Sequence, residues 1–186
     1  MTETYISVDI EASGPIPGEY SMLSLGACVV GATNSNFYVE LKPITKNFDP
    51  ESLAVAGFDL EQLDRDGVDS LQAMRDFAAW LKAVTPSDSR PIFAAYPLAF
   101  DWMFVAYYLN RFLGHNPFGY TGFDFKSFYM GVTGISWDDA NEFSPKQRFN
   151  LAQDLTHNAR EDAIAQADLL TQLFLLANEN RTPPKR

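Results

Sequence analysis

Residues 5–11 read Tyr-Ile-Ser-Val-Asp-Ile-Glu, and this stretch decides the fold because apolar and polar side chains alternate along it. Alternation with a period of two is typical of a β-strand with one buried face. Glycines and prolines between residues 14 and 18 then break the pattern. We therefore expect a first strand that ends in a loop.

Two further strand patterns follow, over Met22–Val30 and Phe37–Leu41, with a turn-rich stretch at Gly31–Asn36 between them. Three successive strands joined by short turns predict an antiparallel meander. The next segment, Asp49–Leu63, is typical of broken helix. A better helix is expected from Ser70, as its cap, through Val84.

The sheet is expected to resume after this helix. Pro91–Tyr96 is short and apolar, as in a buried strand, and a helix is predicted from about Asp101 to Leu113, ending at Gly114. Residues 114–150 are expected to hold two short helices.

The last predicted helix opens at Asn158, which with Glu161 forms a capping-box pattern, and runs to about Asn178. Its inward face is predicted to carry Ala159, Asp162, Ala165, Leu169, Leu173 and Leu176. We expect one domain over residues 1–179 and a disordered tail over 180–186.

Composition limits the class of protein. The chain has 186 residues, of which 46% are hydrophobic, as expected for one globular domain. A single cysteine, Cys28, excludes a disulfide framework and a cysteine-cluster zinc site, and its apolar surroundings predict a buried thiol. The sequence begins without a signal-peptide pattern and has no apolar run long enough to cross a bilayer. We expect a soluble, cytoplasmic protein with no membrane contact.

The net charge of −10 is opposite in sign to that of a broad nucleic-acid binder. Much of the excess lies in residues 49–76, which we interpret as a solvated helical surface without a catalytic role. Any polyanionic substrate must then be held through a small local contact. The acids of this segment are Asp49, Glu51, Asp59, Glu61, Asp64, Asp66, Asp69 and Asp76.

Four carboxylates are predicted to point inward. Asp9 and Glu11 leave the same face of the first strand, with Cα atoms ~6.6 Å apart. Asp101 and Asp162 each lie at the start of a helix on its apolar face. Helical spacing does not bring a basic side chain to these faces, so divalent cations are the simpler counter-charge. Hard oxygen ligands favour Mg²⁺ or Mn²⁺ over zinc, and two such ions could bridge a phosphate.

His157 lies five residues before Asp162, on a predicted loop. Histidine titrates near ~6.5, which suits a general base that takes a proton from water. We interpret the second histidine, His115, as a surface or capping residue.

Three motifs, in this order and spacing, resemble those of the DEDDh 3'-5' exonuclease superfamily: Asp9-Ile-Glu11, Phe100-Asp101 and His157-Asn-Ala-Arg-Glu-Asp162-Ala163. The third motif is the specific one, and its histidine, in place of tyrosine, indicates the DEDDh branch. The superfamily includes the proofreading subunit of bacterial replicative polymerase, ribonuclease T and oligoribonuclease. The resemblance implies a ribonuclease H-like α/β fold, with the antiparallel meander plus parallel strands in one mixed sheet flanked by helices.

The resemblance also implies roles for individual residues. Two Mg²⁺ ions, which Mn²⁺ could replace, would be held by Asp9, Glu11, Asp101 and Asp162, with Asp9 bridging them. His157 would activate the hydrolytic water. The loop Ala12-Ser13-Gly14 would let the backbone approach the terminal nucleotide. Pro97 stands where the family often has asparagine.

Aromatic side chains are candidates for stacking on single-stranded bases. They are Phe100, Tyr96, Tyr20 and Phe125, although aromatics in such a chain are more often core, and we expect this of Phe100. Met22 and Leu23 are candidates for an apolar wedge at the mouth of the site.

The function indicated is metal-dependent hydrolysis at the 3' end of single-stranded DNA or RNA or of short oligonucleotides, releasing nucleoside 5'-monophosphates. Trimming of RNA and proofreading or repair of DNA both stay open, as do a monomer and a homodimer. The alternative is a noncatalytic nucleic-acid-binding or scaffold domain of the same fold, which the intact acid set argues against. A dinucleotide-binding oxidoreductase is excluded because no Gly-x-Gly-x-x-Gly turn follows the first strand.

Overall fold

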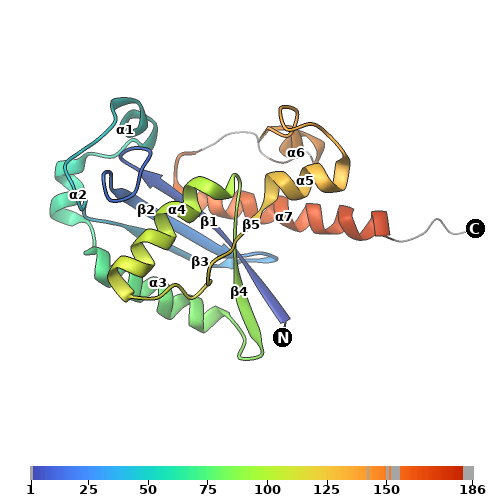
Figure 1. Cartoon of the computed structure of the whole chain (residues 1–186), viewed down its shortest axis with the longest axis horizontal. Helices are drawn as coiled ribbons and strands as arrows, with labels where there is room; N and C mark the ends of the chain where they lie inside the picture. Colours follow the sequence, from blue (N-terminus) through green and yellow to red (C-terminus); the bar gives the residue numbers. More distant parts are fainter. Residues whose placement is uncertain (1, 142, 150, 152–155, 182–186) are drawn as a thin grey trace, which may run out of the picture.

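A computed structural model describes residues 2–141, 143–149, 151 and 156–181, and its strands form one mixed sheet in the order β3-β2-β1-β4-β5 (Figure 1). β1, β2 and β3 form the expected antiparallel meander, while β4 runs parallel to β1 and β5 runs parallel to β4. The strands are β1 (Thr2–Ala12), β2 (Met22–Val29), β3 (Ala32–Glu40), β4 (Ser89–Ala95) and β5 (Phe123–Asp124).

Helices surround this sheet, with α1 and α2 at one end of the molecule and α5, α6 and the far half of α7 at the other (Figure 1). They are α1 (Pro50–Ala56), α2 (Leu60–Asp66), α3 (Ser70–Val84), α4 (Leu98–Tyr108), a π-helical turn η1 (Leu109–Leu113), α5 (Phe125–Thr133), α6 (Phe143–Arg148) and α7 (Ala159–Arg181). Among the described residues, no helix is both long and apolar enough to span a membrane.

One face of the sheet carries large apolar side chains. Ile6, Val8 and Ile10 are buried in a core that includes Phe77 of α3 and Phe104 of α4. The strand with one buried face that the alternation of residues 5–11 predicted is therefore confirmed, because every second side chain enters this core.

The opposite face is covered by α7. Its side chains are small or polar beside the start of this helix, while further along Tyr5 and Val30 pack against a second apolar cluster that includes Leu170 of α7. Gly26 pairs with Asp9 across β1 and β2. A Cβ at Gly26 would lie 2.0 Å from the carbonyl oxygen of Ala159, so α7 begins in direct contact with the sheet backbone. On the same face the Cys28 thiol is buried, as expected, and contacts the carbonyl oxygen of Ala163 at 3.4 Å.

Several element boundaries differ from the predicted ones. β3 begins at Ala32, so the predicted turn over Gly31–Asn36 is mostly strand, and its polar residues lie along the exposed edge of the sheet. The side chain of Asp69, rather than Ser70, caps α3 by accepting from the N–H of Leu71. α4 begins at Leu98 and the predicted helix continues through η1, while β5 falls in the segment where only helices were expected.

The start of α7 agrees with the capping-box pattern, because Asn158 Oδ1 accepts from the backbone N–H groups of Arg160 and Glu161. The predicted inward face is wrong in two places, since Ala165 and Leu176 are only half-buried. The buried residues of α7 are Ala159, Asp162, Ala163, Gln166, Ala167, Leu169, Leu170 and Leu173. α7 continues through Arg181, and residues 182–186 of the predicted tail lie outside the described residues.

The acidic segment 49–76 forms α1, α2 and the first half of α3, and its carboxylates are nearly all exposed, as expected of a solvated surface. Three of them also have a local structural role. The side chains of Asp49, Asp59 and Asp69 each accept from a backbone N–H in the first turn of the helix that follows.

Candidate active site

The candidate site lies where β1 extends beyond β4. The pairing of the two strands ends at Ser7 and Ala94, after which β1 continues to Ala12 while the chain leaves β4 for α4. A small pocket of about 150 Å³ opens at this point, and it brings together all five residues of the predicted motif set. Its lining is Asp9, Ile10, Glu11, Tyr96, Pro97, Phe100, Asp101, His157, Asp162 and Gln166.

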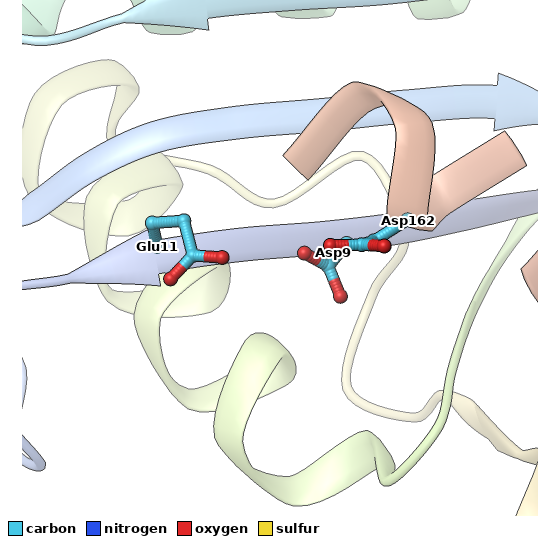
Figure 2. Close-up of side chains that lie close together, drawn as sticks. All are labelled: Asp9, Glu11 and Asp162. Carbon is cyan, nitrogen blue, oxygen red and sulfur yellow. The ribbon is translucent and has the colours of Figure 1, made fainter. Parts of the chain in front are cut away.

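Three carboxylates form the tightest group in the pocket. One oxygen from each of Asp9, Glu11 and Asp162 lies within 4.8 Å of the other two. Figure 2 shows Asp9 and Glu11 leaving β1 and Asp162 approaching from the first turn of α7. The close contact of α7 with Gly26, beside Asp9 in the sheet, is what brings Asp162 to β1.

Asp101 lines the same pocket but is held differently. It is 4% exposed, and its Oδ1 accepts a hydrogen bond from the backbone N–H of Ile10 at 3.1 Å. This N–H lies beyond the last residue of β1 that pairs with β4. Asp101 therefore takes over the hydrogen bond that a longer β4 would have made.

The electrostatics of the pocket disfavour several negative charges at once. Burial, together with the charge of Asp162, raises the pKa of Glu11 to about 7. Burial also raises the pKa of Asp101 to about 8, with Glu11 adding to the effect and the N–H of Ile10 opposing it. Ionisation of the full set is thus favoured only when positive charge enters the pocket.

The two arginines nearest in sequence are engaged elsewhere. The guanidinium of Arg160 lies 5.6 Å from the ring centroid of Tyr38, and Arg111 donates a hydrogen bond to the hydroxyl of Tyr107. The sequence-based argument that neither lies on the inward faces is confirmed.

His157 lies at the rim of the pocket, exposed and one residue before the cap of α7. Its backbone has φ of 52°, which is uncommon for a residue with a side chain. Thr156 helps to hold this turn, because its backbone N–H and its hydroxyl donate to Asp162 Oδ1 at 3.2 and 3.3 Å. His115 lies in another part of the molecule, exposed, beside Lys82 in a separate cavity.

Gln166 is the pocket residue that the sequence reasoning missed. Its Nε2 donates to Asp9 Oδ1 at 2.8 Å, and its Oε1 accepts from the backbone N–H of Tyr96 at 3.1 Å. One signal could have found it, since Gln166 follows Asp162 by four residues and so lies one helical turn further along the same face.

The predicted loop contacts are not in the lining of this pocket. Ser13 is buried, and its hydroxyl donates to the carbonyl oxygen of Asn47 and accepts from the N–H of Ser21. A Cβ at Gly14 would lie 2.3 Å from the ring of Tyr20. The small residues of Ala12-Ser13-Gly14 are thus explained by packing within the loop.

The apolar candidates also need correction. Met22 and Leu23 are fully buried, so neither side chain is available as a wedge, because both lie inside the sheet's packed layers. Phe100, expected in the core, is 37% exposed and lines the pocket. The early start of α4 explains this, since it places Phe100 in the first turn. Tyr96 and Phe125 are core residues, and Tyr20 is half-buried.

Comparison with known proteins places this site in a family. No family model matches the chain. The 3'-5' DNA exonuclease Cap18 of Escherichia coli is 40% identical over 181 residues, which cover 96% of this chain and 96% of that protein.

Solved structures share the fold. The nuclease domain of 3'hExo, a DEDDh family member bound to rAMP, superposes with a TM-score of 0.75 over 94% of this chain and 92% of its own, at 11% identity. E. coli exonuclease I in complex with a dA16 oligonucleotide gives a TM-score of 0.69 over 96% of this chain, at 16% identity. The chain spans 43% of exonuclease I, and less than two thirds of several other matched structures.

The identity with the Escherichia coli enzyme, over nearly the full length of both proteins, and the shared fold lead to one conclusion. The chain belongs to the same family as this 3'-5' DNA exonuclease and is an enzyme of that class. Its fold is that of the DEDDh exonuclease 3'hExo. The ribonuclease H-like fold expected from the sequence is confirmed, and the noncatalytic alternative is set aside.

Proposed function

We propose that this exonuclease shortens single-stranded DNA from its 3' end and releases nucleoside 5'-monophosphates one at a time. The observation that carries the proposal is the convergence of Asp9, Glu11 and Asp162 in a pocket of about 150 Å³. The 40% identical relative is a 3'-5' exonuclease, so we place the 3' end of the strand at this pocket. DNA is proposed over RNA because the 40% identical relative is a DNA exonuclease.

The donor set of the pocket fits divalent cations. The three grouped side chains are all carboxylates, and Asp101 adds a fourth to the lining. Hard oxygen donors of this kind suit Mg²⁺ or Mn²⁺, and we propose that Asp9, Glu11, Asp101 and Asp162 hold two such ions. When bound, the ions would stabilise negative charge on the attacking and leaving oxygens of the phosphodiester.

Two other pocket residues have proposed roles toward the substrate. His157 at the rim would take a proton from the attacking water, and its exposure leaves the imidazole free to reach the scissile phosphate. Phe100 presents part of its ring to the pocket and would stack on the terminal base.

The test uses 5'-labelled single strands of DNA and RNA, a DNA duplex and a circular single strand. We expect a one-nucleotide ladder from linear DNA in Mg²⁺, slower cleavage of RNA and duplex, and an intact circle. Chelator and Asp9→Asn should each abolish the ladder. Cleavage of the circle, or full activity in excess chelator, would contradict the proposal.

A salt series tests how the strand is held. The chain carries a net charge of −10, so few phosphates can be neutralised by the protein. Two or three contacts predict a slope of about −1.5 to −2 when log affinity is plotted against log salt concentration. A slope several times steeper would contradict the end-binding model.

A further inference from the structure

Gln166 connects two parts of the site that are far apart in the sequence. It is buried in α7, with 5% of its surface exposed, and it spans the gap that opens where β1 and β4 separate. On one side lies the Asp9 carboxylate, and on the other lies the backbone N–H of Tyr96, the first residue after β4.

The orientation of the Gln166 side-chain amide follows from its partners. The N–H of Tyr96 can only donate, so the carbonyl oxygen Oε1 must face it. Nε2 then faces Asp9, whose Oδ1 accepts its hydrogen bond. The donor is thus aimed at Asp9 before any ligand arrives, and its burial strengthens the hydrogen bond.

We propose that Gln166 is a positioning residue: it fixes the Asp9 carboxylate relative to the start of the β4–α4 connection, from which Asp101 follows. This inference rests on the proposed function, in which Asp9 and Asp101 hold the same pair of divalent ions. Without Gln166, the carboxylate of Asp9 would lose one of the contacts that orient it toward Glu11 and Asp162, and its place relative to Asp101 would be less defined.

Residues that orient metal-binding carboxylates have a measurable signature. Their loss weakens metal binding and turnover while the rest of the substrate site persists. A residue that only supports the fold would instead lower stability and change kcat and KM together, with metal affinity unchanged in the folded fraction.

The experiment compares Gln166→Met, which keeps the side-chain volume but removes both hydrogen bonds, with Gln166→Asn, which keeps the amide but is too short to span both partners. Gln172→Met, half-buried on the same helix and outside the pocket lining, is the matched control. Mn²⁺ binding to the free protein is measured by calorimetry, and thermal unfolding and single-strand hydrolysis are measured in parallel.

We expect both Gln166 variants to bind Mn²⁺ ~10 to 100-fold more weakly, with kcat reduced to a similar extent and KM for the oligonucleotide little changed. The control should match wild type. Mn²⁺ affinity within about two-fold of wild type in both variants would overturn the proposal, because loss of a residue that orients a metal ligand weakens metal binding by more than this. Asp9→Asn tests the metal site separately from the role of Gln166. If that variant binds Mn²⁺ like wild type, the metal-site proposal itself fails.

Discussion

The two faces of β1 differ in what they bury. On one face, Ile6, Val8 and Ile10 enter a core of large apolar side chains beneath α3 and α4. On the other, Asp9 and Glu11 lie near the start of α7, in a pocket that also holds Asp162 and Gln166. Residues 5–11 thus place most of their buried apolar side chains on one face of the sheet and both of their carboxylates on the other.

This difference explains how a carboxylate site can lie directly beside an apolar core. Large apolar side chains on both faces would hold α7 away from the sheet and leave Asp162 too far from Asp9. The glycine at position 26 lets the helix approach backbone to backbone. The polar face is also less favourable energetically, since the buried Ser7 hydroxyl has no hydrogen-bond partner among the described residues. Changes on the two faces should therefore have different consequences.

After loss of a metal-binding carboxylate, the largest expected effect on activity is at the rim of the polar face. His157→Ala should lower kcat by ~10² to 10⁴, because the proposed general base is removed, while the melting temperature stays near that of wild type. Single-turnover hydrolysis of a 3' labelled strand measures it. His115→Ala is the control, and a larger loss there than at His157 would show that the base is misassigned.

The apolar face should show the reverse pattern. Phe77 is fully buried and contacts the rings of Phe37, Trp80 and Phe118. Phe77→Ala should lower the free energy of unfolding by about 3–5 kcal/mol through lost burial and a cavity. Urea titration measures the loss. The folded fraction at low temperature should retain kcat, and a kcat as low as that of His157→Ala would break the distinction between the faces.

A change at Gly26 should affect both properties. Gly26→Ala places a Cβ against the backbone of Ala159, which must move and carry Asp162 with it. We expect a loss of about 1–3 kcal/mol in stability from overpacking. Displacing a reacting group by about 1 Å can cost ~10² in rate, so kcat should also fall. Urea titration and oligonucleotide hydrolysis on one sample measure the two losses, and unchanged activity would show that α7 can shift without moving the carboxylate.

The pH dependence of stability tests the raised pKa values of the buried carboxyl groups. Because the pKa of Glu11 is raised from 4.5 to about 7, the folded state holds more protons than the unfolded state across this interval. The same holds for Asp101 between 3.8 and about 8. Stability must then fall as pH rises through these intervals.

For the metal-free protein we therefore expect the melting temperature to decrease between pH 5 and pH 8 because of these two groups, and Glu11→Gln to flatten the decrease. Scanning calorimetry in chelator measures it, and adding Mg²⁺ should reduce the slope. A melting temperature that rises across this range, with no response to Glu11→Gln, would contradict the raised pKa.

The smallest expected effect concerns a glycine without a close neighbour. Gly131 lies in α5, is exposed, and an added Cβ there meets no atom within 4 Å. Gly131→Ala should raise the free energy of unfolding by about 0.5–1 kcal/mol through helix propensity, with activity unchanged. A gain in stability for Gly131→Ala beside a loss for Gly26→Ala would confirm that close packing at position 26, rather than the loss of a glycine, causes the destabilisation. Urea titration of both variants measures the two changes.

Much of this arrangement could be predicted because it is encoded locally. The alternation of residues 5–11 fixes two faces, and the capping pattern at Asn158 fixes the start of α7, so Asp9, Glu11 and Asp162 were placed together from sequence. The features that were missed depend on long-range contacts. Gln166 has a role only because β4 ends beside it, and a two-residue strand such as β5 is defined by its partner.

Two other misses have local causes. α4 begins after a proline that offers no side-chain cap, so its first turn carries no sequence signal, and Phe100 was assigned to the core instead of the pocket. In β3, exposed polar residues resemble a turn because edge strands need little apolar character on one side.

The single thiol can report on the opening of the site. Cys28 lies under α7 against the carbonyl of Ala163, and burial raises its pKa to about 12. A thiol reagent can therefore react only when α7 lifts from the sheet or the chain unfolds. The same helix carries Asp162 and Gln166. The rate at which a thiol reagent labels Cys28 in the native protein therefore reports how often this side of the pocket opens, and it can be measured without any substrate.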